Sequence, residues 1–368
     1  MSSPNSKLRV AVVGGSGYAG GEACRLLSNH PAVGEVVPTS RGDDDFDRAH
    51  PNLLGSGLSF KHTDSVLEDP SKFHAALLCT PTGEAMRIAP ALLAAGLTVV
   101  DLSADFRFDN PGSFRSAHGK EHTATQLLAD AVYGATELNR HSLDSARLIA
   151  NPGCYAITAL LALAPLIDSP WVDTAALIHI AAVNGTTGAG ITPRPETSHA
   201  EVFGSMLPYN LSGHRHAPEI EDQLSRIAGT PITVDLATAH GNYARGIFIQ
   251  ASVSLRADIR TDVTREDILG IYTRRYGRDG DGDFFVRINE HNAVGGLTDK
   301  DYRRYPSLAS VVGSNFCHIG LDYDPRIGVV RVVGVSDNLV KGAAGSAIQN
   351  LNVALGLDET TGLRTYGL

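Results

Sequence analysis

One cysteine stands where its thiol could act as a nucleophile. Cys154 follows Asn151-Pro152-Gly153, a run that breaks the chain just before an apolar segment of helical character. The dipole at the start of a helix favours the thiolate, which is the nucleophilic form of cysteine. The other cysteines lie within helix or strand patterns and are expected to be small core residues. We therefore predict that Cys154 attacks an electrophilic carbon.

A histidine-rich turn supplies the candidate base. His214 and His216 come just before Pro218, where a helix is expected to begin. Imidazole exchanges protons near neutral pH and can take the proton of a thiol. If the turn is locally extended, only one of the two rings faces Cys154. We favour His216, keep His214 as the alternative, and expect Glu219 to hold the His216 ring in one tautomer.

A glycine-rich turn near the N-terminus has the spacing of a dinucleotide-binding loop. Gly15-x-Gly17-x-x-Gly20 directly follows the apolar strand pattern of Leu8 to Val13 and opens a helical pattern. Glycines let the backbone approach a pyrophosphate closely, and the helix N-terminus attracts its negative charge. The cofactor-binding residues predicted here are Gly14, Ser16, Gly17, Tyr18, Ala19 and Gly20.

The end of the second expected strand favours NADP(H) over NAD(H). An NAD-binding domain carries Asp or Glu near this position, where the carboxylate binds the ribose hydroxyl. This chain has Thr39-Ser40-Arg41, and the Ser40 hydroxyl and Arg41 guanidinium suit a 2′-phosphate. Asp43-Asp44-Asp45 follows closely and would favour NAD(H) if the strand were longer.

The elements that must position these residues show two patterns. Up to about residue 150, short apolar strands alternate with helical segments, which predicts an α/β doubly wound parallel sheet of the Rossmann type. Beyond Cys154, an apolar helix from Tyr155 to Ile167 leads into strands that alternate in polarity, such as Ile247 to Leu255. Such strands predict an α+β domain, a mixed sheet with helices on one face.

The two patterns divide the chain into three expected segments. Residues 1–153 form an NADP-binding domain, residues 154–336 a catalytic, substrate and oligomerisation domain, and residues 337–368 a C-terminal helix returning to the first domain. Within the second segment, Thr264 and Asp267 have the spacing of a capping box at a helix start.

Composition narrows the classes of function. The 368 residues carry a formal charge of −9, which argues against nucleic-acid or membrane-surface binding because both favour a basic face. No apolar run reaches the ~20 residues of a membrane span, and the first residues form no signal core. The four cysteines form no CxxC pair, so we expect no metal site or disulfide framework, and the chain suits a reducing cytoplasm.

Five motifs, in this order, resemble those of the N-acetyl-γ-glutamyl-phosphate reductase family of arginine biosynthesis. They are Gly15-Ser16-Gly17-Tyr18-Ala19-Gly20-Gly21-Glu22, Asp101-Leu102-Ser103-Ala104-Asp105-Phe106-Arg107, Asn151-Pro152-Gly153-Cys154, Gly213-His214-Arg215-His216-Ala217-Pro218-Glu219 and Asp337-Asn338-Leu339-Val340-Lys341-Gly342. The resemblance implies NADP(H), a Cys154–His216 catalytic pair, and a homodimer or homotetramer.

The resemblance also implies roles for residues outside that pair. Asn338 meets the nicotinamide end of the cofactor, and Thr80 and Pro81 lie on the cofactor path. By analogy with related aspartate-semialdehyde dehydrogenases, Arg107 and Asn151 hold a leaving phosphate. The full set of substrate-binding residues implied is Ser103, Arg107, Asn151, His214 and Arg245.

The activity implied by the resemblance is NADPH-dependent reductive dephosphorylation. The substrate is an N-acyl-γ-glutamyl or δ-aminoadipyl phosphate, and a Cys154 thioester leads to the semialdehyde. Two other classes fit parts of the sequence. A cysteine hydrolase would use Cys154 and His216 but leaves the glycine loop unexplained, and an NADP-binding scaffold leaves Cys154 unexplained.

A second branch of relatives shares further motifs with this chain. His50-Pro51-Asn52-Leu53 and Tyr302-Arg303-Arg304-Tyr305-Pro306 look like the LysW-carrier-dependent reductases of lysine biosynthesis. That likeness implies a substrate tethered to a small acidic carrier protein, which arginines such as Arg194 and Arg215 would face. The chain departs from the family pattern at three places, Thr82, Thr136 and the stretch Val183 to Gly190, and the last of these bears on substrate choice.

Overall fold

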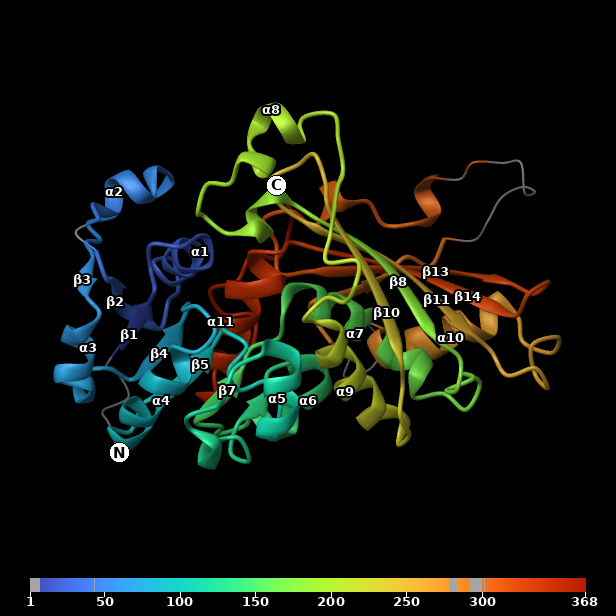
Figure 1. The fold of residues 1–368 in the computed structure, drawn as a ribbon, viewed down its shortest axis with the longest axis horizontal. Helices are drawn as coiled ribbons and strands as arrows, with labels where there is room; N and C mark the ends of the chain where they lie inside the picture. The colour runs from blue at the N-terminus through green and yellow to red at the C-terminus, as the bar shows by residue number, and fades with distance from the viewer. Residues whose placement is uncertain (1–6, 43, 278–282, 292–299, 301) are drawn as a thin grey trace. The chain divides into compact units, whose positions relative to one another are not determined.

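The computed structural model describes residues 7–42, 44–277, 283–291, 300 and 302–368. The chain forms two compact units, one made of Met1–Gly153 with Ala343–Arg364 and the other of Cys154–Gly342 with Thr365–Leu368. The sequence placed its second boundary after residue 336, whereas the chain returns to the first unit after residue 342. Each unit has its own sheet, drawn as arrows in Figure 1.

The first unit is built on a seven-stranded, wholly parallel sheet in the order β3-β2-β1-β4-β5-β7-β6. The order reverses direction between β1 and β4, and ligands of doubly wound sheets bind beyond the carboxyl ends of strands at such a point. The predicted parallel sheet is confirmed. Its strands are β1 (Leu8–Val13), β2 (Val33–Ser40), β3 (Lys61–His62), β4 (Ala75–Leu78), β5 (Thr98–Asp101), β6 (Val132–Tyr133) and β7 (Leu148–Ala150).

Helices and a C-terminal segment complete the first unit. α11 (Gly345–Ala354) packs against α1, α6 and β5, and α4 packs against β5 and α3. Buried amides hold α11 in place: Asn350 Nδ2 donates to the Gly134 carbonyl at 2.7 Å, and Asn350 Oδ1 accepts from Thr136 Oγ1 at 2.7 Å. The other helices are α1 (Tyr18–Leu27), α2 (Phe46–Ala49), α3 (Asp64–Glu68), α4 (Ala85–Ala94), α5 (Pro111–His118) and α6 (Thr136–Leu143).

The second unit is built on a mixed sheet in the order β12-β13-β14-β11-β8-β10-β9. The pairs β8–β10 and β12–β13 are parallel and the others antiparallel. Buried and accessible residues alternate along β11 because one face is packed and the other is open. The strands are β8 (Ile178–Asn184), β9 (Leu207–Tyr209), β10 (Val234–His240), β11 (Ile247–Ser254), β12 (Val286–Ile288), β13 (Cys317–Asp324) and β14 (Val329–Ser336).

Helix α7 (Cys154–Ile167) is the central helix of the second unit. It contacts strands β11 and β14 and helices α9 (Ala217–Ala228) and α10 (Arg265–Tyr276). Figure 1 shows these three helices on the same side of the strands. Every residue of α7 except Cys154 is buried, as its apolar sequence requires. α10 begins with the expected capping box of Thr264 and Asp267.

The remaining turns of helix are short. They are α8 (His199–Val202), the 3-10 helices Pro51–Leu53, Pro70–Lys72, Thr125–Leu127, Thr186–Ala189, Pro195–Thr197, Tyr302–Arg304 and Leu308–Ser310, and a π-helix at Val340–Ala344. Within the described ranges, no helix has both the length and the apolar character that crossing a bilayer demands.

Candidate active site

Cys154 lies at the first position of α7 and lines a cavity of about 610 Å³ in the second unit. The cavity brings together the predicted nucleophile and both predicted histidines, with side chains from β8, β9 and β10. Gly342 fits closely beside the cysteine, because a Cβ at this glycine would lie 2.8 Å from Cys154 Cβ. This contact accounts for the glycine that ends the last of the five motifs.

Asn184 is a site residue that the sequence analysis did not identify. It ends β8, is 2% exposed, and its Nδ2 lies 3.8 Å from Cys154 Sγ, within the range of an N–H···S hydrogen bond. Its Oδ1 is buried and has no hydrogen-bond partner among the described residues. Gly188 leaves space for the amide, since a Cβ there would meet Asn184 Nδ2 at 2.0 Å. The only sequence signal was the departure from the family pattern at Val183 to Gly190.

The structure separates the roles available to the two histidines. His214 Nδ1 accepts the backbone N–H of His216 at 3.1 Å, so in the neutral ring the proton is on Nε2. Burial, with Arg215 nearby, lowers the pKa of His214 to about 4. A ring that is neutral and already bonded in this way is a poor general base at neutral pH.

The assumption of a locally extended turn is wrong. The backbone of His216, the N-cap of α9, is helical (φ −85°, ψ −12°), and the Ala217 N–H donates to the His214 carbonyl at 2.9 Å in a turn. Alternation therefore does not separate the two rings. Both line the cavity, with centroids 4.8 Å apart. Glu219, three residues later, is buried in the first turn of α9, where the helix dipole favours a carboxylate.

Two tyrosines form the wall against which the histidines pack. Tyr209 donates its hydroxyl to Tyr155 Oη at 3.0 Å, and Tyr155 in turn donates to the Ala239 carbonyl at 3.4 Å. The His214 ring meets both tyrosine rings edge-on, at 5.4 and 5.6 Å between centroids. Burial raises the pKa of both phenols, so they stay neutral and act as a fixed frame.

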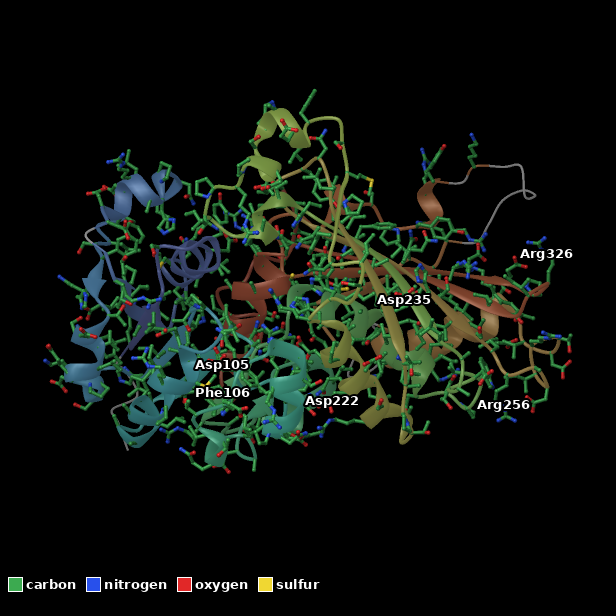
Figure 2. The ribbon with its side chains drawn as sticks, viewed as in Figure 1. Asp105, Phe106, Asp222, Asp235, Arg256 and Arg326 are labelled. Carbon is green, nitrogen blue, oxygen red and sulfur yellow. The ribbon has the colours of Figure 1, made fainter. Side chains whose placement is uncertain are left out.

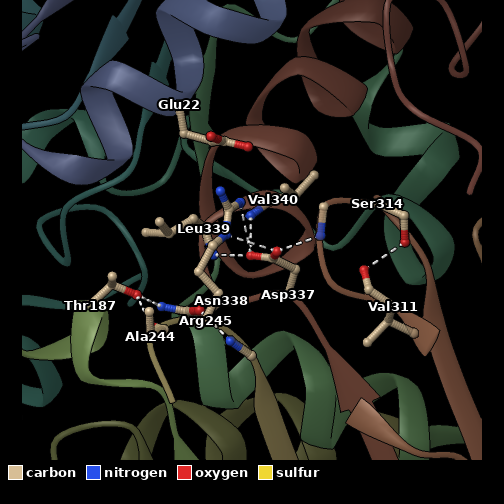
Figure 3. Close-up of polar contacts among 12 residues, drawn as sticks. Glu22, Thr187, Ala244, Arg245, Val311, Ser314, Asp337, Asn338, Leu339 and Val340 are labelled. Atoms are coloured by element: carbon tan, nitrogen blue, oxygen red, sulfur yellow. Dashed lines mark hydrogen bonds and ion pairs between the residues drawn. The ribbon is translucent and has the colours of Figure 1, made fainter. Parts of the chain in front are cut away.

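A buried carboxylate organises the loop that carries Asn338 (Figure 3). Asp337 is fully buried and accepts two hydrogen bonds from Arg245, at 3.0 and 3.2 Å, and one from Gly313 N at 2.7 Å. Asn338 Oδ1 accepts from Gly246 N at 2.7 Å, and its Nδ2 donates to Thr187 Oγ1 at 2.8 Å. In this structure both predicted binding residues, Arg245 and Asn338, are thus bonded within their own unit.

In the first unit, the glycine-rich loop has the geometry that close approach of a ligand requires. Gly14 has a φ of +83°, and a Cβ there would lie 2.5 Å from the Cys79 carbonyl oxygen. At Gly20 a Cβ would lie 2.4 Å from the Gly14 carbonyl oxygen. Gly17 differs, because its nearest neighbour would be 3.9 Å away. The space beside Gly17 is open where the dinucleotide fingerprint places the pyrophosphate.

Other predicted cofactor residues lie at the ends of β2 and β4. Thr80 Oγ1 is buried and lacks a hydrogen-bond partner in the described part of the chain, as expected for a group that meets a ligand. Pro81 follows it and is exposed, as are Tyr18 at the start of α1 and Arg41. Ser16 and Ala19, the other predicted residues of the loop, are partly accessible.

The strand end bears on the choice between NADP(H) and NAD(H). β2 ends at Ser40, so the strand is no longer than expected. Ser40 Oγ donates to Asp44 Oδ2 at 2.6 Å, which brings a carboxylate to the strand end. Arg41 lies next along the chain, with its guanidinium 3.8 Å from Glu84. Asp43 lies outside the described residues.

The predicted phosphate ligands are buried in the first unit. Arg107 donates to the carbonyls of Asn151 and Leu102 at 3.0 and 3.1 Å. Asn151 donates to the Ala343 carbonyl at 3.2 Å, and its Oδ1 accepts from Asn350 at 3.0 Å. Contact with a phosphate would require these donors to be shared or exchanged.

Ser103 belongs to a network of two buried carboxylates. It donates its N–H and its hydroxyl to Asp101, at 2.8 and 2.9 Å. Burial, reinforced by the nearby Asp105, raises the pKa of Asp101 to about 7. Asp105, labelled in Figure 2, accepts the N–H groups of Gly83 and Met86 and so fixes the turn before α4. No cluster of three or more His, Cys, Asp or Glu side chains suited to a metal occurs in the described ranges.

Comparison with known proteins follows the division into two units. Residues 9–146 match the model of the semialdehyde dehydrogenase NAD binding domain, and residues 154–338 match that of the semialdehyde dehydrogenase dimerisation domain. Aspartate semialdehyde dehydrogenase II of Vibrio cholerae has the same fold, with a TM-score of 0.68 at 17% identity over 96% of this chain and 99% of that one.

Curated relatives align over nearly the whole length. The N-acetyl-gamma-glutamyl-phosphate reductase of Methanosphaera stadtmanae is 36% identical over 99% of both chains. The LysW-L-2-aminoadipate/LysW-L-glutamate phosphate reductase of Saccharolobus solfataricus is 38% identical over 98% of both. As the five motifs predicted, this chain belongs to the semialdehyde dehydrogenase family and is an oxidoreductase of its phosphate reductase group.

Proposed function

We propose that the protein reduces the acyl phosphate of an N-acylated acidic amino acid, N-acyl-γ-glutamyl phosphate, to the semialdehyde, with NADPH as reductant. The observation that carries the proposal is the cavity in which Cys154, at a helix N-terminus, shares a lining with His216 and has the Asn184 amide 3.8 Å from its sulfur. Near full-length relatives named phosphate reductases support this chemistry over acyl hydrolysis.

The first unit fits a dinucleotide. The open space at Gly17, the unpartnered hydroxyl of Thr80 and the N-terminus of α1 suit a pyrophosphate and its ribose. Ser40 and Arg41 would hold the 2′-phosphate of NADP(H), with Asp44 as the competing acceptor for a free hydroxyl. When bound, NADPH supplies hydride to a carbonyl carbon. Asn338 is proposed to meet its nicotinamide end through the amide hydrogen not directed at Thr187.

The first half of the proposed reaction transfers the acyl group to the protein. His216 takes the thiol proton, and the Cys154 thiolate attacks the acyl carbon. A C–S bond forms while the C–O bond to phosphate breaks, so inorganic phosphate leaves and a thioester remains. Arg107, Ser103 and Asn151 are the proposed phosphate ligands, because a guanidinium and neutral donors stabilise the dianion. Glu219 is proposed to steady the charged His216 ring.

The second half releases the aldehyde. Once the thioester carbonyl has accepted hydride, the oxygen of the resulting hemithioacetal takes the proton held by His216. Collapse then breaks the C–S bond, returns that proton to His216 and regenerates the Cys154 thiolate. A thioester accepts hydride far more readily than a carboxylate, which is why a covalent route is advantageous.

A second candidate substrate is the same acyl phosphate joined to a small acidic carrier protein. It is favoured by the relatives named for LysW conjugates at 37 to 38% identity. Arg194 and Arg215 line the Cys154 cavity and are exposed, so they offer positive charge to such a partner. We further propose a homo-oligomer, a dimer or tetramer, formed through the dimerisation domain.

The experiment that tests the proposal is the reverse reaction. The protein is given NADP, phosphate and free N-acetylglutamate semialdehyde, and NADPH formation is followed by absorbance, with Cys154→Ser as the negative control. Turnover with the free aldehyde supports the first candidate. Turnover only with an aldehyde conjugated to a carrier supports the second. In the forward direction, hydrolysis of the acyl phosphate to the free acid without oxidation of NADPH would refute both and indicate a hydrolase.

A further inference from the structure

We infer that His50 is a positioning residue for the dinucleotide loop, an inference that rests on the proposed use of NADP(H). Its ring is 5% exposed, and Nε2 lies 2.7 Å from the Gly15 carbonyl oxygen. A carbonyl only accepts, so Nε2 carries the proton and donates. The bond fixes the peptide between Gly15 and Ser16, and therefore the direction of the N–H groups that follow toward Gly17.

A second observation concerns Gly21, which the dinucleotide fingerprint does not require. Its φ is not positive, so backbone conformation gives no reason for glycine. A Cβ there would lie 2.3 Å from His50 Cε1 and 2.5 Å from Nδ1. The imidazole therefore packs against the first turn of α1 so closely that it fills the place of a side chain at Gly21, which accounts for a glycine within the helix.

The ring is itself held from behind by aromatic side chains. Phe46 packs edge-on against His50 at 5.1 Å between centroids, and Phe60 at 6.0 Å. Phe60 also supports the loop directly, since a Cβ at Gly15 would lie 3.3 Å from its Cε1. Phe46, His50 and Phe60 thus form an aromatic cluster that packs against the glycine-rich loop. The segment 46–60 that carries the cluster follows Arg41 in the chain, so it connects the proposed 2′-phosphate site with the loop proposed to bind the pyrophosphate.

The test is direct binding of NADPH, measured by the quenching of protein fluorescence, together with steady-state kinetics. We expect His50→Ala to weaken NADPH binding about five- to tenfold, the effect of one buried hydrogen bond. The kcat at saturating NADPH and the KM for the acyl phosphate should stay within about twofold of wild type, because the inference assigns His50 to the cofactor loop and not to the Cys154 cavity or the proposed phosphate ligands. His50→Gln keeps a donor at similar reach and should restore most of the affinity.

A double variant tests the steric part. Gly21→Ala should weaken NADPH binding because its methyl group meets the ring, and Gly21→Ala with His50→Ala should bind better than Gly21→Ala alone. His141→Ala, on an exposed helix position, is the matched control and should bind like wild type. Should His50→Ala fail to fold, His50→Gln and the double variant still decide the matter.

Two results would overturn the inference. One is wild-type NADPH affinity in folded His50→Ala. The other is equal loss of thermal stability in His50→Ala and His50→Gln with no change in affinity, which would make the ring merely structural. Failure of the proposed function is distinguishable, because wild-type protein would then not oxidise NADPH with the acyl phosphate, a readout separate from the effect of His50 on NADPH affinity.

Discussion

Replacing Asn184 with alanine should make Cys154 a slower nucleophile. The Asn184 amide places a polar hydrogen-bond donor at Cys154 Sγ, 3.8 Å away, and β8 and Gly188 hold it there. A hydrogen bond to an ionised group contributes about 1.5 to 3 kcal/mol, and a long bond to sulfur should contribute about 1 kcal/mol. At about 1.4 kcal/mol per tenfold change, the thiolate fraction falls about fivefold.

Alkylation by iodoacetamide measures this effect without substrate. Cys24 and Cys317 are fully buried, and burial raises the pKa of Cys24 to about 12 and that of Cys79 still further. The fast-reacting thiol is therefore Cys154. In Asn184→Ala the rate near neutral pH should fall about fivefold, and the whole pH profile should move to higher pH.

Two further variants define the result. Asn184→Asp keeps the shape but opposes the thiolate with a negative charge, so it should react more slowly than Asn184→Ala. Asn242→Ala removes an exposed amide of the same unit and should react like wild type. An unchanged pH profile in Asn184→Ala would refute the assignment of this amide to the thiolate.

Four other outcomes are expected. Cys154→Ser should bind NADPH with unchanged affinity in a fluorescence titration yet lose nearly all turnover. His216→Ala should reduce kcat by about 10² to 10⁴, whereas His214→Gln should keep a much larger share of the wild-type kcat. Burial lowers the pKa of His214 from its ordinary 6.5 to about 4, so between these pH values the unfolded chain binds a proton that the folded chain does not. The free energy of unfolding should therefore fall as the pH drops through this window, by at most about 3 kcal/mol. In His214→Gln, the free energy of unfolding measured by denaturant titration should depend less steeply on pH. Arg41→Ala should raise the KM for NADPH about tenfold and leave that for NADH unchanged, and equal effects on both would contradict a 2′-phosphate contact.

Features that are local in sequence were the ones predicted well. The strand from Leu8, the glycine loop and α1 follow one another directly, so spacing alone specifies the elements and their order. The same holds for the capping box at Thr264 and for the buried character of α7, both of which depend on neighbouring residues. The resemblance carried by the five motifs further indicated that the cofactor-binding unit precedes the catalytic unit along the chain.

Features that depend on pairing across the chain were not predictable from one sequence. Asn184 reaches the cysteine because β8 lies beside β10 and β11 in the sheet, and no local pattern indicates that order. The hydrogen-bonded ion pair of Arg245 and Asp337 joins residues that are 92 positions apart in the chain. The histidine turn shows the same limit locally, because the backbone at His216 is helical where the sequence analysis considered an extended turn.

The return of residues 343–364 to the first unit has a consequence for dissecting the protein. Gln349 donates to Glu137, and Asn352 Oδ1 lies 2.9 Å from His30 Nε2, so polar groups of the N-terminal segment rely on partners from the far end of the chain. A fragment stopped at residue 153 would expose these groups and much apolar surface. An autonomous nucleotide-binding module would have to be made by splicing 7–153 to 343–364 through a short peptide bridge.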